Sequence, residues 1–178
     1  MTDHRQNANS NTALFLMELI VVIGFFSLVS VICVRLFVAA SVASTNSVNL
    51  NHATRAIESL ADAWTACDSD LNGLSALYPG AKLSLSDPAD PYSGVLTIGF
   101  DENWQPESYD DSTPRRQGFV IYLRAERVPA ASVYGPDAAG DAVTAAISSL
   151  HCADGTAIGS LTVDHYLFLT ETAGEGSR

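Results

Sequence analysis

The feature that most constrains this chain is an apolar run near its N-terminus that is long enough to cross a lipid bilayer. From Leu19 to Ala43 only Arg35 is charged, and a helix needs about 20 such residues to span the hydrocarbon core. We therefore expect this run to insert into a membrane. A cleaved secretory signal is the alternative, because residues 38–40 and 41–43 are small, but such signals have shorter apolar cores without acidic residues.

A glutamate stands at the head of this run. The stretch "ALFLMELIVVIGFFSL" covers residues 13–28, and its sixth residue is Glu18. A carboxylate inside a bilayer costs roughly 3 kcal/mol on insertion scales, unless a cation meets it at the same depth. The other interpretation is an acid close enough to the membrane surface to need no partner. Arg35 has no evident partner in the sequence, so we expect its side chain to extend toward the outer membrane interface.

The remainder of the chain is acidic. The formal net charge is -11, and residues 44–178 account for it, with seven Lys and Arg against eighteen Asp and Glu. Such a surface repels nucleic acid and anionic lipid. The composition therefore excludes nucleic acid as an expected partner.

The distribution of helix-breaking residues predicts one long helix. All seven prolines lie at or after Pro79, and Gly24 is the only glycine in residues 1–72. A single helix from Leu14 to Cys67 would be about 80 Å long at 1.5 Å per residue. In its second half, apolar residues recur at spacings of three and four, which predicts one buried stripe. The stripe consists of Leu50, Ala53, Ile57, Leu60, Trp64 and Cys67.

Beyond Gly73 the apolar residues alternate with polar ones, which is typical of strands. The predicted strands are 82–86, 94–100, 118–128, 141–152 and 157–170. Asp154 and Gly155 predict a type I′ hairpin between the last two, because both central residues of that turn need a positive φ. The face of the last strand expected under the helix carries Leu161, Val163, His165, Leu167 and Leu169. The fold class is therefore α+β, a long N-terminal helix packed on an antiparallel sheet of four or five strands.

These features together resemble the type IV pilin and type II secretion pseudopilin family, in particular its minor, prepilin-like members. The family motif is a small residue, usually Gly, then a hydrophobic new N-terminus, often Phe, and a glutamate four residues further on. Counting back from Glu18 places the new N-terminus at Leu14 and the small residue at Ala13. In the family, prepilin peptidase cuts at this point and methylates the new amine. The glutamate then pairs with the amine of a neighbouring subunit during assembly.

The resemblance implies a division of the chain and a role for it. Residues 1–13 would be the leader, 14–43 the transmembrane and filament-core half of the helix, 44–170 the extracytoplasmic pilin-like domain, and 171–178 a flexible tail. The implied partners are other pilin or pseudopilin subunits, prepilin peptidase, a membrane assembly platform and membrane lipid. The implied location is the cytoplasmic membrane, with the domain outside, and a surface filament after assembly. Pilus, secretion and DNA-uptake systems all remain open.

Other motifs point away from catalysis and cofactors. The sequence has no G-x-S-x-G motif, no glycine-rich phosphate loop and no paired carboxylates within an evident cleft motif, so we expect no enzyme activity and no cofactor. The stretch "DSDLNG" (68–73) has the spacing of half an EF-hand loop, but Pro79 occupies the position of the required acidic ligand. We interpret it instead as a helix end with a left-handed turn at Asn72 and Gly73. The four histidines lack ligand spacing, so no metal site is expected.

Two alternatives remain open from the sequence. Cys67 and Cys152 both fall in the outer domain, where they could form a disulfide worth about 4 kcal/mol at best or remain free thiols, while Cys33 lies in the apolar run. The competing function is a membrane-anchored or secreted, non-enzymatic ligand-binding domain. It would use Trp104, Tyr109 and the acidic loops as its exposed contact residues.

Overall fold

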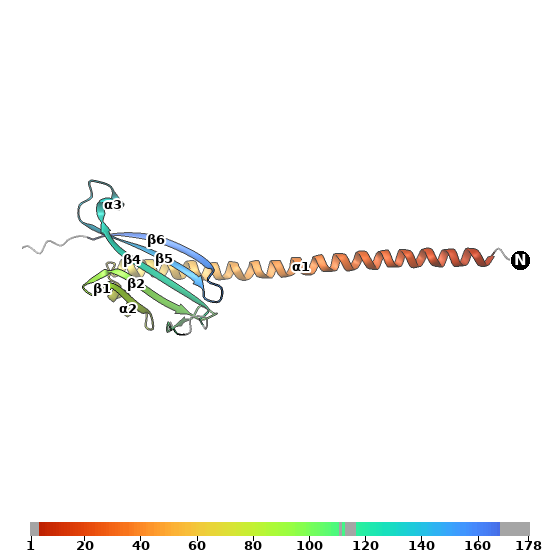
Figure 1. The fold of residues 1–178 in the computed structure, drawn as a ribbon, viewed down its shortest axis with the longest axis horizontal. Coiled ribbons are helices and arrows are strands. Elements are labelled where there is room, and N and C mark those ends of the chain that lie inside the picture. The colour runs from red at the N-terminus through yellow and green to blue at the C-terminus, as the bar shows by residue number, and fades with distance from the viewer. Residues whose placement is uncertain (1–3, 111, 113–116, 168–178) are drawn as a thin grey trace, which may run out of the picture. The chain divides into compact units, whose positions relative to one another are not determined.

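The structure is a computed structural model that describes residues 4–110, 112 and 117–167 (Figure 1). Its internal contacts divide the chain into two compact units, one ending at Val48 and the other beginning at Asn49. Helix α1 (His4–Ala66) contributes to both of them.

Helix α1 is uninterrupted over its 63 residues, which confirms the prediction of one long helix. The residues that end α1 differ from the prediction. Asp68 and Ser69 adopt positive φ values of 51° and 65°, and helix α2 (Leu71–Leu77) begins directly afterwards. Asn72 therefore lies inside α2, where its backbone N–H donates to the Asp70 carboxylate at 2.8 Å. The predicted left-handed turn at residues 72–73 was wrong, because Asp70 caps a new helix at that point.

The second unit contains an antiparallel sheet in the order β1-β2-β4-β5-β6, and every neighbouring pair in this order is antiparallel. The two-residue β3 adds to the outer edge of β2 near its end. The five predicted strands correspond to the five long strands, so the α+β fold class is confirmed. The elements are β1 (Lys82–Asp87), β2 (Asp90–Phe100), β3 (Pro106–Glu107), β4 (Phe119–Pro129), the short helix α3 (Ala130–Tyr134), β5 (Asp141–His151) and β6 (Ala157–Leu167).

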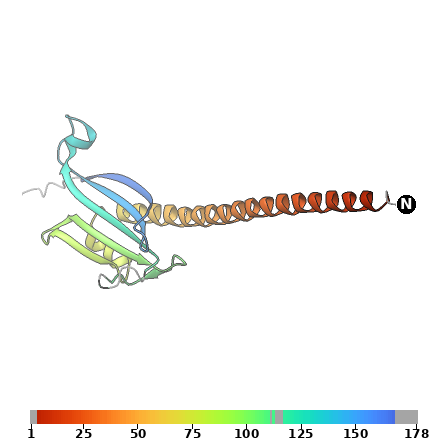
Figure 2. The same cartoon turned by 45° about the vertical axis from the view of Figure 1, so that its right-hand side comes forward.

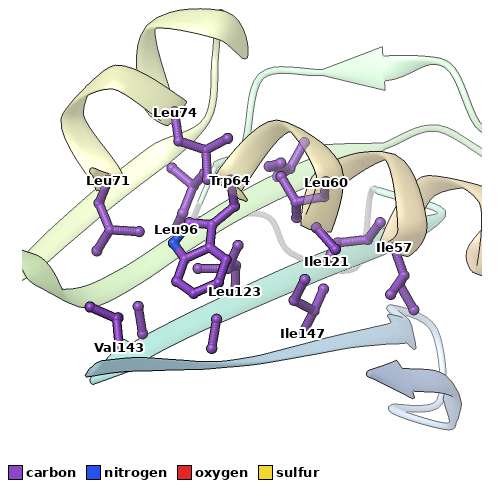
Figure 3. Packing of buried hydrophobic residues seen from close by; sticks show 14 of the residues in the cluster. Ile57, Leu60, Trp64, Leu71, Leu74, Leu96, Ile121, Leu123, Val143 and Ile147 are labelled. Carbon is purple, nitrogen blue, oxygen red and sulfur yellow. The ribbon is translucent and has the colours of Figure 1, made fainter. Parts of the chain in front are cut away.

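The core of this unit lies between the last turns of α1 and one face of the sheet (Figures 1 and 2). Ile57, Leu60 and Trp64 on α1 are at most 4% exposed. They pack in one cluster with residues of β2, β4 and β5. Residues that lie directly opposite each other on these neighbouring strands point to the same face of the sheet, which brings the buried ones together. Figure 3 shows Trp64 together with Leu71 and Leu74 of α2 and with strand residues that include Leu96, Leu123, Val143 and Ile147.

The predicted stripe and strand face extend less far than the sequence suggested. Leu50 is 49% exposed, although it has the helical phase of the stripe, and Leu161 on β6 is 37% exposed. No residue of β6 is fully buried, because the strand pairs only with β5 on one side. His165 is half-buried and meets Trp64 edge to face, with ring centroids 6.1 Å apart. Leu169 lies outside the described residues.

The hairpin between β5 and β6 was predicted with the wrong turn type. Gly155 has a positive φ of 70°, but Asp154 does not, so a type I′ turn does not form. Instead, the Gly155 N–H donates to the His151 carbonyl at 2.8 Å, which closes a longer loop. The Asp154 carboxylate accepts from the Thr156 N–H and lies 3.0 Å from Nδ1 of His151. These side-chain contacts stabilise the longer loop in place of the tight turn.

Candidate functional site on the N-terminal helix

The strongest candidate site is the part of α1 that lies in the first unit. In residues 13–48 of the chain, every large apolar side chain is exposed, and Phe26 and Phe37 reach 72% and 77%. By length and composition, this is the one helix among the described residues that is apolar enough to cross a membrane. Apolar surface of this extent is unfavourable in water, so lipid or other protein must cover it. We call residues 13–43 the apolar segment.

Four hydroxyl side chains of this region are compatible with an apolar environment. The hydroxyl groups of Ser27 and Ser30 each donate to the backbone carbonyl four residues earlier, at 2.8 Å. Thr45 and Ser47 make the same bond at 3.2 and 2.9 Å. Since the helix also satisfies its own backbone, these hydroxyls need no water.

Glu18 and Arg35 are the two charged residues between Ala13 and His52, and both are exposed on α1. In the part of the chain that the structure describes, neither forms an ion pair. A charge within an apolar surface is costly without a partner. Any partner for these two groups must therefore come from outside the described chain.

The predicted processing residues Ala13 and Leu14 lie within α1, not in a loop. Both are exposed, Leu14 at 64%. The helix begins at His4, so the bond between them belongs to regular helical backbone. A peptidase acting at this bond would act on a locally opened helix.

Trp104, predicted as an exposed binding residue, is instead partly buried against the core. Its ring stacks on Phe119 with centroids 4.1 Å apart, and its Nε1 donates to the Asn49 side chain at 3.4 Å. His52 of α1 lies beside it, at 6.0 Å between ring centroids. Trp104 has a positive φ of 61°, which is strained for a bulky residue. This prediction was wrong, because the strained turn directs the ring inward toward α1 and β4.

Tyr109 is also half-buried and lines a small pocket of about 150 Å³ on the sheet. Burial, together with a hydrogen bond to Tyr109, raises the pKa of Tyr122 in this pocket to about 12. Burial likewise raises the pKa of the Cys152 thiol. Both groups are therefore protonated at neutral pH, and the thiol is not activated as a nucleophile.

The structure favours the free-thiol alternative for the two outer cysteines. Cys67 and Cys152 are both unpaired. Cys152 follows β5 at the end of the sheet where Phe119 stacks on Trp104, which contacts Asn49. Cys67 lies eighteen residues after Asn49, or about 27 Å along a helix. A disulfide requires Cα atoms within about 7 Å, so these positions are too far apart.

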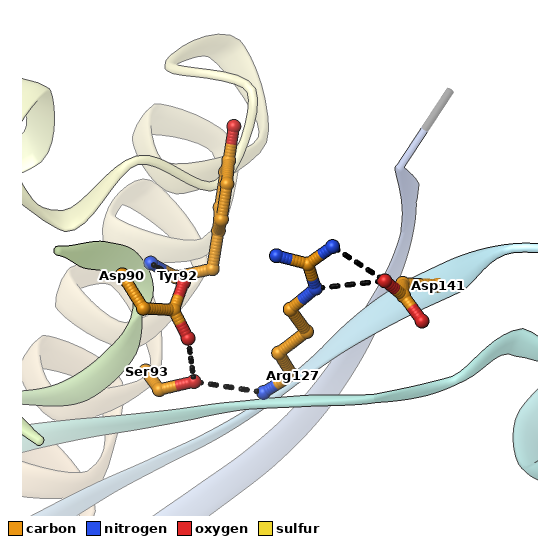
Figure 4. A network of polar contacts seen from close by, with 5 residues as sticks. All are labelled: Asp90, Tyr92, Ser93, Arg127 and Asp141. Carbon is orange, nitrogen blue, oxygen red and sulfur yellow. Dashed lines mark hydrogen bonds and ion pairs between the residues drawn. The ribbon is translucent and has the colours of Figure 1, made fainter. Parts of the chain in front are cut away.

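A polar network connects three strands at the end of the sheet opposite to Phe119 and Trp104 (Figure 4). Nε of Arg127 donates to the Asp141 carboxylate at 2.9 Å, and this bond raises the pKa of Arg127 further. The Arg127 N–H donates to the Ser93 hydroxyl, which donates to Asp90. The guanidinium carbon lies 6.0 Å from the ring centre of Tyr92. The network links β2, β4 and β5, and its partly exposed ion pair contributes little stability.

The described residues contain no group of three or more His, Cys, Asp or Glu that could hold a metal ion. In the half EF-hand stretch, Asp70 acts as the N-cap of α2. The absence of a metal site stays a prediction.

Comparison with known proteins assigns no relative to the chain. No family model matches it, and neither the curated proteins nor the solved structures give a significant match. The resemblance thus stands at the level of architecture. A long N-terminal apolar helix packs on an antiparallel sheet, which is a pilin-like arrangement.

Proposed function

We propose that this chain is a structural subunit, a minor pilin or pseudopilin, of a type IV pilus-like or type II secretion-like filament. The observation that carries the proposal is the apolar segment with exposed Glu18, on the same helix that packs on the sheet farther along. Such a helix can be held first by lipid and later by other subunits, because both cover apolar side chains equally well. The role is non-enzymatic.

The proposed sequence of events uses the residues at the start of the apolar segment. Prepilin peptidase removes residues 1–13 and leaves an amine at Leu14. The assembly platform then adds the subunit to the filament, where Glu18 meets the amine of a neighbouring copy. A carboxylate and an ammonium at the same depth neutralise each other, which makes the buried glutamate tolerable.

Processing is tested by co-expressing the chain with a prepilin peptidase and measuring the intact mass. We expect the loss of residues 1–13 and a new N-terminus at Leu14, with no loss when the peptidase is omitted. A mature N-terminus at Ser41 or Ser44 would instead identify a secretory signal and overturn the proposal.

Assembly is tested by the substitution Glu18→Ala. We expect membrane insertion to stay intact or improve, because a costly charge is removed. Incorporation into filaments should be abolished, because the partner of the neighbouring amine is also removed. Arg55→Ala, on an exposed position of the same helix, is the matched control. Incorporation of Glu18→Ala at the wild-type level would show that Glu18 is only a tolerated acid.

The alternative, an anchored or secreted ligand-binding domain, has less support. Its two proposed contact residues are engaged within the domain, Trp104 by stacking and Tyr109 by its contacts around the pocket. A ligand-binding domain would also have no need for Glu18 in its anchor.

A further inference from the structure

The apolar segment carries two opposite charges that are seventeen residues apart. Glu18 and Arg35 are both exposed on α1, and the residues between them are uncharged. At 1.5 Å per residue, the separation is about 26 Å along the helix axis. The segment from Ala13 to Asn51 thus has no net charge from its side chains, yet neither charge is neutralised within the described chain.

A membrane and a filament treat these two charges differently. The hydrocarbon core of a bilayer is about 30 Å thick, so two groups about 26 Å apart each lie close to one of its surfaces. Both side chains can then reach water. In a filament core, other helices surround the segment and this route to water is lost. A charge buried there needs an opposite charge, because an unpaired one is strongly destabilising.

We propose that Glu18 of one copy pairs with Arg35 of a second copy when the subunits assemble. The two parallel helices are shifted along their axes by about 26 Å, which brings the two residues to the same level. This inference rests on the proposed filament function and names a contact within it. The second copy is the occupant of this surface, because it supplies both charges in equal number.

The geometry of one helix explains why such a contact continues from copy to copy. At 3.6 residues per turn, a seventeen-residue separation places Glu18 and Arg35 about 100° apart around the axis. Each copy therefore contacts one neighbour through Glu18 and a different neighbour through Arg35. Such head-to-tail contacts produce open helical assemblies, not closed dimers. The contact between Glu18 and the amine at Leu14 needs a shift of only four residues, about 6 Å, and so involves another neighbour.

The first test is a charge exchange in the full chain, with filament incorporation and membrane insertion measured for every variant. We expect Arg35→Glu to lower incorporation by roughly tenfold or more, because it opposes two carboxylates. Arg35→Lys should retain most of it. Arg55→Glu, the same charge change at an exposed position in the second unit, should have no effect.

A second test leaves both charges in place. In a Cys33→Ser background, chains carrying Val22→Cys are mixed with chains carrying Ala39→Cys, each one turn beyond a charged residue. These positions have the same seventeen-residue shift, so oxidation of filaments should link the two kinds of chain. Gly24→Cys replaces Val22→Cys in the control, since it turns the thiol to nearly the opposite face. The cross-link yield should then fall severalfold.

The outcomes separate this contact from the proposed function. If the wild-type chain does not enter filaments at all, the filament function itself is overturned. If it does, but Arg35→Glu incorporates normally and the two cysteines do not cross-link, the pairing is wrong and the filament function stands. A cross-link equal to that of the Gly24→Cys control would also overturn the pairing.

Discussion

The two ends of helix α1 are built for different surroundings, although both are regular helix. In the apolar segment, apolar side chains are exposed all around the axis. From Ala53 to Trp64, burial instead recurs every three or four residues, and Arg55, Glu58 and Asp62 are exposed between the buried positions. Backbone conformation therefore does not decide what covers a helix. The angular distribution of its apolar side chains does.

One continuous helix can serve both roles because its backbone is the same in both. A helix satisfies its backbone hydrogen bonds internally, so it tolerates lipid, protein or water along its length. Only the side chains must change where the surroundings change. The change of contacts occurs at Val48 and Asn49, and the first fully buried side chain within residues 13–66 follows at Ala53.

The largest effect is expected from Trp64→Ala in a chain of residues 44–178, which we expect to fold as a soluble acidic monomer. Trp64 is fully buried, and truncating such a residue costs about 3 to 5 kcal/mol of the roughly 5 to 15 that hold a domain. Urea unfolding should show a severe loss. Arg55→Ala on the exposed face should change the unfolding free energy by less than about 0.5 kcal/mol. Equal, small effects would break the comparison, since the helix would not pack through this stripe.

A charge introduced into the apolar segment should weaken membrane insertion and leave the stability of the second unit unchanged. We expect Val31→Asp to weaken membrane insertion by about 3 kcal/mol, because an aspartate near the centre of a span is costly. Val31 lies outside the second unit, so the unfolding of that unit should not change. Alkaline extraction of membranes measures the first effect, with Val31→Leu as the control. Normal insertion of Val31→Asp would show that this segment is not in contact with lipid.

Two smaller substitutions locate the boundary between the exposed and the buried part of α1. Ile57→Val removes one methylene from a fully buried side chain and should cost about 0.5 to 1.5 kcal/mol of unfolding free energy. Leu50→Ala removes more atoms but from a side chain that is 49% exposed, so we expect less than about 0.5 kcal/mol. Urea midpoints of the two variants decide the order. A larger cost at Leu50 would extend the buried stripe by one turn.

The smallest expected effect is a pH dependence of stability, which should be found in the second unit and not in the apolar segment. Hydrogen bonds from Thr156 hold the pKa of Asp154 below its usual value. Its stabilising contribution is therefore complete above the ordinary aspartate pKa and is lost as the pH falls through the lowered value. Asp154→Asn should make the acid-side loss of stability in the second unit slightly shallower. Residues 19–34 contain no carboxyl group, so helicity measured there should not change over this range.

Much of the fold followed from patterns that are local in the sequence. The long helix, the five long strands and the stripe from Ala53 to Trp64 were all predicted, because alternation and helical spacing report which residues share a face. The two turn predictions failed because Asp70 and Asp154 form local side-chain hydrogen bonds that favour other backbone conformations. The other errors concern burial, which depends on packing between distant segments. Leu50 has the right phase but is exposed, and Trp104 looked like a loop residue but packs inward.

The predictions about the candidate site also fall into those that local sequence supports and those that depend on distances between segments. Glu18, Arg35 and the apolar residues around them could be recognised from composition alone, since a charge in an apolar run is a local feature. The state of the two outer cysteines could not, because it depends on the distance between the end of α1 and the end of β5. No spacing in the chain reports that distance.

One long apolar helix and an alternating, acidic remainder that forms strands could both be predicted from the amino-acid sequence alone. These properties arise from composition and from periods of a few residues. The contact between Trp104 and Asn49, fifty-five residues away in the chain, became evident only in the folded structure. It depends on two distant segments, whose interaction energy appears only when they meet in space.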